Sequence, residues 1–305
     1  MTKDMIIIGA FDGLKWLTIS QLFLAICFPL LNIIAVTNLF HEGGEVWATR
    51  LGSRVGAVGF FKHPGNLALY TIMSMSFFLS CYLSGFQRRM STLLIAACVA
   101  TVILTYSRTS FIALILVAFC TYYIYKNSKK NIFSLGNILK IVIPSTLALY
   151  WLIFLSPFSS SFIESDASSQ YDNRMIHFFM AFKIFTDSPF LGVGLNAHLG
   201  YITKHFGIVQ AFTADEFYLH NPIHNSHLIV LAETGIVGFI LWVYFLLGGI
   251  INAKNQIAAG SNRIFSSTLV GVLIAYVIYG MTGWAPMSPS IFAFFLFYAY
   301  FAKMY

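Results

Sequence analysis

Long apolar runs alternate with short polar segments along almost the whole chain. A helix of about 20 apolar residues crosses a hydrocarbon core of ~30 Å, and runs of about this length recur. The eight predicted spans lie at 16–37, 66–85, 90–107, 109–125, 138–156, 226–250, 264–282 and 289–303. The last is short enough to be tilted, interfacial or partly re-entrant. The pattern predicts an all-α, polytopic membrane protein, with 1–305 as a single membrane domain.

Composition supports this class. Hydrophobic residues make up 58% of the chain and charged residues 10%, whereas soluble domains carry roughly 25% charged residues. The segment 1–15 lacks the shape of a signal peptide, because its apolar part is short and no small-residue cleavage site follows. We interpret this segment as a cytoplasmic or interfacial lead-in. A disulfide framework is not expected, because all cysteines lie inside apolar runs: Cys27, Cys81, Cys98 and Cys120.

Short loops rich in Lys and Arg predict the orientation. If every span crosses, these loops fall on one side, at 88–89, 126–130, 254–263 and 303. The positive-inside rule makes that side cytoplasmic, so both termini lie inside. The outward segments are then 38–65, 107–108, 157–223 and 283–288. The same rule accounts for the formal net charge of +7 without a nucleic-acid partner.

The segment 157–223 is the long extracytoplasmic loop of this topology. Loops of such length are usually folded and functional. After a polar part at 159–170, apolar side chains recur at helical spacing from Asp172 to Thr186, with Asp172 as candidate N-cap and Pro189 beyond the end. This pattern predicts an amphipathic helix that lies on the bundle or on the membrane. The run 191–194 predicts a turn, and a second short helix can follow it.

The stretch from His220 to Gly249 passes from polar residues into an apolar run. Proline suits the first turn of a helix, so we expect the helix to begin between Pro222 and Asn225. His224 and Asn225 then lie at the membrane interface. In a straight helix Glu233 lies ~13.5 Å below His224, which favours a buried, hydrogen-bonded residue over an acid catalyst.

Three residues near the outer interface could act on a diphosphate. Arg108 lies between two apolar runs with almost no loop around it, Arg174 lies at the start of the outer helix, and His224 lies at the mouth of a span. Arginine binds phosphate oxygens through a bidentate fork. Histidine, with an ordinary pKa of about 6.5, can serve as a general base. A structural salt bridge or a lipid head-group contact is the alternative for each arginine.

A zinc site is the alternative role for the histidines. His220, His224 and His227 lie close together in the sequence, but Pro222 interrupts the turn that would bring in His220. No carboxylate follows in the pattern of a known zinc helix. We therefore predict neither a metal nor another cofactor.

Four motifs, taken in order, resemble the O-antigen ligase and O-antigen polymerase superfamily of bacterial envelope glycosyltransferases. The similarity extends over roughly residues 50–250. Members of this superfamily usually have ten or more spans, so we expect a short or an incomplete member. The motifs are Gly56–Leu69, Thr105–Arg108, Asn173–Arg174 leading to Ser188–Gly194, and His224-Asn225-x-x-Leu228-x-x-x-x-Glu233-x-Gly235.

The resemblance implies an enzyme of the bacterial cytoplasmic membrane. Its donor is expected to be an oligosaccharide on undecaprenyl diphosphate, transferred on the extracytoplasmic face to a glycan or lipid-glycan acceptor, with inversion and without a metal. The resemblance implies that Arg108 and Arg174 bind the diphosphate and that His224 activates the acceptor hydroxyl. Asn225 is expected to orient the histidine or a sugar.

Lys62 and Asn66 belong to the first motif. Pro64 and Gly65 between them are typical of entry into a span, which is the structural interpretation of the motif. We nevertheless expect Lys62 and Asn66 to contact phosphate or sugar.

Other functions stay open at this point. A polysaccharide or lipid transporter is expected to have charged or Gly/Pro-broken helices in two related halves, and the sequence shows no such pairing. An intramembrane metalloprotease or hydrolase rests on the histidines alone. Polymerisation and ligation share a donor and differ in the acceptor, so the sequence does not separate them.

Overall fold

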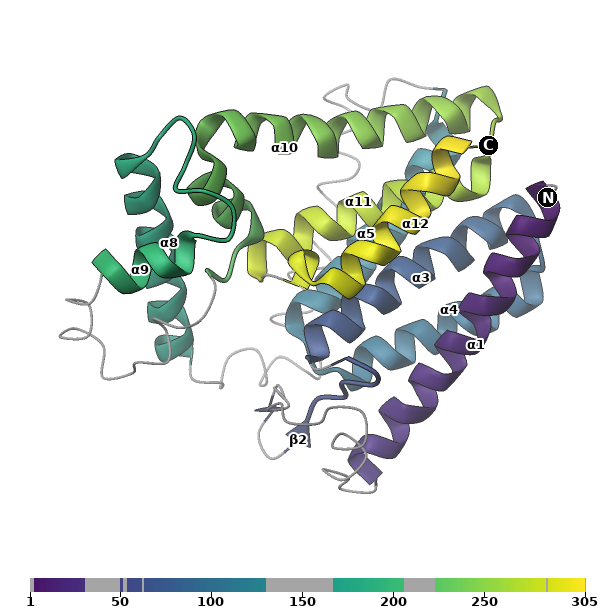
Figure 1. Ribbon diagram of the computed structural model, residues 1–305. Helices are drawn as coiled ribbons and strands as arrows, with labels where there is room; N and C mark the ends of the chain where they lie inside the picture. Colours follow the sequence, from purple (N-terminus) through teal and green to yellow (C-terminus); the bar gives the residue numbers. More distant parts are fainter. Residues whose placement is uncertain are drawn as a thin grey trace. The chain divides into compact units, whose positions relative to one another are not determined.

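The computed structural model describes residues 3–30, 50–51, 54–61, 63–129, 167–205, 223–283 and 285–304 (Figure 1). Most of these residues are helical. A short antiparallel pair, β1 (Arg50–Leu51) and β2 (Arg54–Val55), precedes α3. The helices are α1 (Lys3–Leu30), α3 (Pro64–Ser84), α4 (Arg88–Leu104), α5 (Arg108–Asn127), α8 (Ala167–Asp187), α9 (His198–His205), α10 (Ser226–Ala259), α11 (Arg263–Thr282), the 3-10 turn η4 (Ala285–Met287) and α12 (Pro289–Met304).

Contacts divide the chain into two compact units. Unit 1 comprises residues 1–165, 249–276 and 288–305, and unit 2 comprises residues 166–248 and 277–287. Unit 1 therefore contains α1, α3, α4, α5 and α12, and unit 2 contains α8, α9 and the first part of α10. The single membrane domain over 1–305 and the outer loop at 157–223 stay predictions.

The helical membrane class is confirmed. Among the described residues, five helices are long and apolar enough to cross a membrane: Asp4–Cys27, Pro64–Ser84, Thr109–Asn127, Ser226–Ala259 and Arg263–Met281. The predicted spans 90–107 and 289–303 correspond to α4 and α12, which have 17 and 16 residues. The predicted span 138–156 lies outside the described residues, so the count of eight stays a prediction.

Helix α1 begins earlier than the sequence pattern predicted. It runs from Lys3 through the predicted lead-in, and the candidate span found among the described residues is Asp4–Cys27. The end of the predicted span 16–37 lies outside the described residues. Two charged residues of this segment are paired within the helix, because Lys15 Nζ lies 2.7 Å from Oδ1 of Asp12, three residues earlier. An ion pair of this kind lets two charged residues remain within an otherwise apolar helix.

Helix α3 lies in the interior of unit 1. Its side chains are buried from Pro64 to Phe78, and Phe77 and Phe78 both contact the Phe11 ring of α1. A Cβ atom on Gly271 of α11 would collide with the hydroxyls of Ser76 and Thr121, so α11 approaches α3 and α5 closely there. Small residues at such crossings are typical of membrane bundles.

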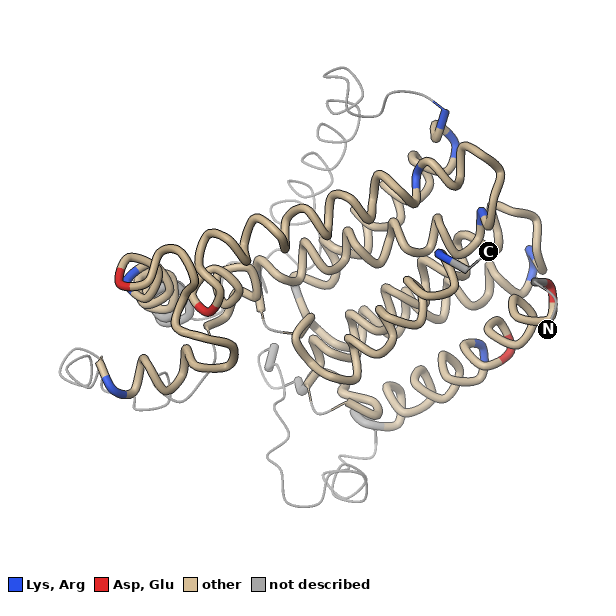
Figure 2. Tube along the Cα trace, turned by 45° about the horizontal axis from the view of Figure 1, so that its top comes forward, with Lys and Arg blue, Asp and Glu red and all other residues tan. Residues whose placement is uncertain are grey.

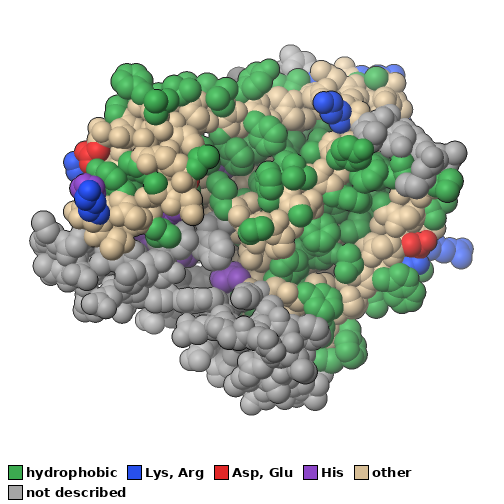
Figure 3. Space-filling view, in the orientation of Figure 1, with side chains coloured by type: hydrophobic (Ala, Val, Ile, Leu, Met, Phe, Trp, Pro, Cys, Tyr) green, Lys and Arg blue, Asp and Glu red, His purple; other side chains and the backbone are tan. Residues whose placement is uncertain are grey.

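The outer surface of unit 1 is apolar over its helices and basic at one end. Hydrophobic side chains cover much of the visible helical face (Figure 3), with Trp16, Phe23 and Leu93 each about two-thirds exposed at 66%, 65% and 65%. Extended exposed apolar surface is typical of contact with lipid. The described Lys and Arg residues of unit 1 gather at the end where both termini lie (Figure 2). Which side of the membrane this end faces stays a prediction.

Helix α8 confirms the predicted amphipathic helix but differs from it in start and face. It begins at Ala167, so Asp172 lies inside the helix and its prediction as N-cap was wrong. Ala167 to Gln170 are compatible with helix and extend it in the N-terminal direction. The buried face is aliphatic, whereas Phe178, Phe179 and Phe182 are exposed. The aliphatic face packs in a cluster of Met180, Ala181, Ile184, Ile202, Ile223, Ile229 and Ala232.

Helix α10 is broken at Gly235, where φ is 62° and ψ is −164°. Figure 1 shows its ribbon turning sharply in the first third of its length. In a regular α-helix the amides of Ile236 and Val237 would donate to the carbonyls of Ala232 and Glu233. The break separates these partners. Four backbone groups therefore need other hydrogen bonds, because unsatisfied groups are costly at membrane depth.

The loop after α8 supplies all four partners. The amides of Val193 and Gly194 donate to the carbonyls of Ala232 and Glu233, over 3.1 and 3.0 Å. In the opposite direction, the amides of Ile236 and Val237 donate to the carbonyls of Pro189 and Phe190, over 2.8 and 3.3 Å. We call this exchange between 189–194 and 232–237 the clasp. It confirms the turn predicted at 191–194 and gives it a partner.

Two glycines make the clasp possible. A Cβ atom on Gly192 would collide with the backbone of Glu233, and a Cβ atom on Gly235 would collide with the backbone of Phe190. Both residues also have positive φ, 66° and 62°. Glycine alone combines this conformation with so close a backbone approach. The third and fourth sequence motifs are therefore joined to each other by their backbones.

The break in α10 also changes which part of the predicted span 226–250 is needed to cross the membrane. Helix α10 has 34 residues, and at ~1.5 Å per residue this gives ~51 Å, well beyond a core of ~30 Å. The part after Gly235 is by itself long enough to cross. Glu233 precedes the break, so the distance of ~13.5 Å from His224 along the helix is not a depth in the membrane.

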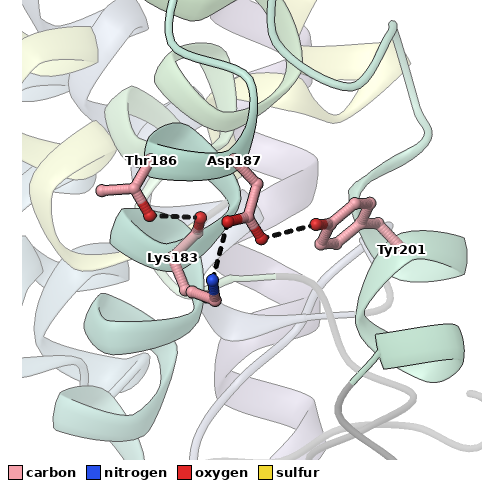
Figure 4. A network of polar contacts seen from close by, with 4 residues as sticks. All are labelled: Lys183, Thr186, Asp187 and Tyr201. Atoms are coloured by element: carbon pink, nitrogen blue, oxygen red, sulfur yellow. Dashed lines mark hydrogen bonds and ion pairs between the residues drawn. The ribbon is translucent and has the colours of Figure 1, made fainter.

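A polar network joins the end of α8 to α9 (Figure 4). Asp187 accepts from Lys183 Nζ at 2.7 Å and from the Tyr201 hydroxyl at 2.6 Å. These two hydrogen bonds, that of Lys183 first, hold the pKa of the Asp187 carboxyl below its usual range. The carboxylate in turn raises the pKa of the Tyr201 hydroxyl. The network fixes α9, the second short helix that the sequence allowed, against α8.

We expect Gly235→Ala to destabilise unit 2 strongly. The strained backbone conformation alone costs ~1–3 kcal/mol for a non-glycine residue, and the collision with Phe190 adds to this. Gly248→Ala in the same helix is the control, because nothing lies within 4 Å of its Cβ position. Thermal unfolding in detergent should show a lower midpoint for the first variant and an equal or higher midpoint for the second. Equal midpoints for both variants would show that the clasp does not form.

Acid should loosen α9 from α8. Because the pKa of Asp187 is lowered in the folded chain, its contribution is present above the ordinary carboxyl value and is lost as the pH falls through the lowered value. Hydrogen exchange of α9 amides, corrected for intrinsic rates, should therefore show less protection at about pH 3 than at about pH 7. In Asp187→Asn the protection of these amides should be low at both pH values. If Asp187→Asn kept the wild-type pH dependence of protection, the effect would belong to another titratable group.

Candidate functional site

His224 lies in a tight turn directly before α10. The amide of Asn225 donates to the carbonyl of Ile223 over 2.8 Å, across the single residue His224. Ile223 itself is fully buried in the cluster formed by α8, α9 and the start of α10. His224 is partly exposed. The turn therefore holds a partly exposed histidine on a backbone that is anchored on its N-terminal side.

Asn225 anchors the other side of the turn. Its Oδ1 accepts from the amides of His227 and Leu228, each over 3.0 Å, which is the geometry of an N-cap. Its Nδ2 donates to the carbonyl of Met281 at the end of α11, over 3.3 Å. Helix α10 begins at Ser226, one residue past the interval predicted for its start. The predicted role of Asn225 toward the histidine or a sugar stays a prediction, and its observed contacts fix the residue next to His224.

Ser226 completes this anchor. Its amide and its hydroxyl both donate to the carbonyl of Gly283, over 3.1 and 2.8 Å. Together with Asn225 it holds the start of α10 on the segment that follows α11. His224 thus lies between two fixed points, and preorganised groups of this kind are what catalytic sites require.

His177 of α8 lies beside His224. The two imidazole rings are nearly parallel, with centroids 5.3 Å apart and an interplanar angle of 9°. The amide of His224 donates to His177 Nδ1 over 3.4 Å. His177 is buried, at 3% exposure. The sequence interpretation missed this residue, and the available signal was its position three residues after Arg174, which places both on one face of a helix.

His227 has a structural role in unit 2. Its Nδ1 accepts from Trp242 Nε1, over 3.0 Å, because an indole nitrogen can only donate. The proton of the neutral ring is then on Nε2, which donates to the carbonyl of Val277 over 3.0 Å. Both nitrogens are in use, so metal binding by His227 through either nitrogen would displace the hydrogen bond made there. His220, the third member of the histidine group, lies outside the described residues.

Glu233 forms a buried pair with His198 at the start of α9. Glu233 Oε1 lies 2.5 Å from His198 Nδ1, and the two side chains are 10% and 5% exposed. Glu233 is therefore a buried, hydrogen-bonded residue, as predicted. Its partner is a histidine of the segment 157–223 that the sequence interpretation did not single out. The carboxylate ties α9 to the same part of α10 that takes part in the clasp.

The candidate site residues fall into both units. Arg174 lies in α8, and His224 and Asn225 lie directly before α10; all three belong to unit 2. Arg108 is the first residue of α5 in unit 1, and the side chains of both arginines lie outside the described part of the structure. Asn66 is the third residue of α3 and is 8% exposed. Lys62 lies outside the described residues.

The first motif lies beside the end of α4 in unit 1. The amide of Ala57 donates to the carbonyl of Leu104, over 2.9 Å, directly before the break between α4 and α5. Ala57 also packs with Ala25 and Leu67, and the amide of Phe60 donates to Gln21 Oε1 over 3.2 Å. The hydrogen bond therefore places the start of the first motif at the end of α4, one residue before the second motif. In unit 2 the third and fourth motifs contact each other directly through the clasp.

His198→Ala should destabilise unit 2. The substitution leaves the Glu233 carboxylate buried without its ionisable partner, and removal of one member of a buried pair typically costs ~3–5 kcal/mol. His205→Ala, on the same helix but exposed, is the matched control and should change little. Chemical denaturation in detergent micelles gives both values. A loss of less than about 1 kcal/mol for His198→Ala would show that the pair does not stabilise the fold.

Comparison with known proteins supports the superfamily suggested by the four motifs. Residues 92–243, about half of the chain, match the family described as O-antigen ligase. A search of curated proteins gave no match. The matched region runs from within α4 into α10, and it includes Arg108, Arg174, His177, the clasp and His224. The chain therefore belongs to the O-antigen ligase family.

Proposed function

We propose that the chain transfers an oligosaccharide from an undecaprenyl-diphosphate donor to a sugar hydroxyl on the extracytoplasmic face of the bacterial cytoplasmic membrane. The observation that carries this proposal is the position of His224 on a turn anchored at both sides, within the region matched to O-antigen ligases. The acceptor is a second lipid-linked glycan in a polymerase and another glycan, for example on a lipid, in a ligase.

In this proposal His224 is the general base. Its neutral imidazole removes the proton of the acceptor hydroxyl as the oxygen attacks the anomeric carbon of the donor sugar. The bond from that carbon to the diphosphate oxygen breaks, and its electron pair leaves with undecaprenyl diphosphate. Attack from the face opposite the leaving group inverts the anomeric configuration. The transfer as written requires neither an oxidant nor a metal ion.

The arginines are proposed to stabilise the leaving group. Charge develops on the diphosphate as the glycosidic bond breaks, and guanidinium groups bind phosphate oxygens with two parallel hydrogen bonds. Arg174 lies on the helix that carries His177, three residues away, and Arg108 begins α5. We further propose that Asn225, Lys62 and Asn66 contact sugar or phosphate.

A transporter is the second candidate, and the break in α10 is the observation that favours it. Broken helices in transporters leave backbone groups free to bind ions or substrate. Here the four groups next to Gly235 are all bonded to the loop at 189–194. The break therefore supports loop docking rather than an ion site.

The division of roles predicts different defects for the arginine and the histidine. Arg174→Lys keeps the charge but loses the fork, so donor affinity should fall. His224→Ala should lower the single-turnover rate by ~100- to 10,000-fold while donor affinity persists. Purified protein in liposomes with the lipid-diphosphate oligosaccharide gives both quantities, and product length on a gel separates polymerisation from ligation.

His205→Ala is the control for this experiment, because His205 is exposed on α9 and has no role in the proposed transfer. It should match the wild type in affinity and rate. If His224→Ala kept near-normal transfer, or lost donor binding, the assignment of His224 as the base would be wrong.

A further inference from the structure

His177 stands out among the buried polar residues of unit 2. It is a histidine at 3% exposure on α8, and its ring lies along that of His224, which is proposed as the catalytic base. An apolar residue could fill the same space. The backbone contact is specific, because Nδ1 of His177 accepts the amide of His224.

These two contacts act on different parts of His224. The hydrogen bond holds the amide, and so adds a third fixed point to the turn already held at Ile223 and Asn225. The parallel ring limits the rotation of the imidazole about its side-chain bonds. Once backbone and ring plane are both restricted, the nitrogen that takes the proton keeps its direction.

We propose that His177 is a positioning residue for His224, through the amide that it accepts and the ring that it presents. This inference rests on the proposed function, since it assumes that His224 is the acceptor base. It also couples two parts of the site, because His177 lies one helical turn from Arg174 on α8. A shift of α8 then moves the base and one proposed diphosphate ligand together.

Three substitutions separate the two contacts. His177→Asn keeps an acceptor oxygen at the position of Nδ1 but has no ring. His177→Phe keeps a ring but has no acceptor. His177→Ala has neither. His205→Ala is the control for loss of an exposed histidine on the same unit.

The first measurement is single-turnover transfer and donor affinity in liposomes. His177→Ala should lower the rate on the order of 10- to 100-fold, because small misplacements of a catalytic group have effects of this size, while donor affinity stays near the wild-type value. The Asn and Phe variants should each recover part of the rate. His205→Ala should leave rate and affinity unchanged.

The second measurement does not depend on transfer. Diethyl pyrocarbonate modifies neutral imidazoles, and mass spectrometry of the peptides gives the rate at His224 relative to exposed His205. The relative rate should rise in His177→Ala, where the His224 ring is uncovered, and return toward the wild-type value in His177→Phe.

The outcomes are distinct. If rate and thermal midpoint fall in parallel in all three variants with no recovery by Asn or Phe, His177 only fills the core and the proposal is wrong. A wild-type rate in His177→Ala also overturns it. If the labelling follows the expected pattern but His224→Ala still transfers, the proposed role of His224 fails and the hold of His177 on its ring stands.

Discussion

The exchange of backbone hydrogen bonds between 189–194 and 232–237 is the interaction on which the rest of unit 2 depends. A helix break frees two carbonyls and two amides, and such groups are costly wherever water is scarce. One loop provides the two donors and two acceptors that are needed. The condition is steric as much as electrostatic, because the backbone of the opposite segment fills the space that a side chain on Gly192 or on Gly235 would need.

The clasp places the groups proposed for chemistry without taking part in it. It fixes the end of α8 to α10, and the pair Glu233–His198 then fixes α9 to the same point. With α8 and α10 held together, the aliphatic cluster between them buries Ile223 and brings His224 against His177. Each of these contacts restricts the position of the element that makes the following one. The position of His224 is therefore fixed by residues several helical turns away.

Much of this arrangement could be predicted from the sequence, and the misses have physical causes. Apolar runs indicated the helices, and the order of polar motifs indicated the family, because both are local properties of the chain. Partners such as His198 for Glu233 could not be found, since nothing local links residues 35 positions apart. The depth assigned to Glu233 assumed a straight helix, and the break at Gly235 is apparent only once Gly192 is seen opposite it.

The broken helix makes the shape of α10 depend on a segment outside it. In an unbroken helix the amides of Ile236 and Val237 would donate to the carbonyls one turn earlier. The bent form replaces these two hydrogen bonds within the helix by four with the loop at 189–194. The bend at Gly235, and with it the direction in which the start of α10 presents His224, is therefore a joint property of the loop and the helix.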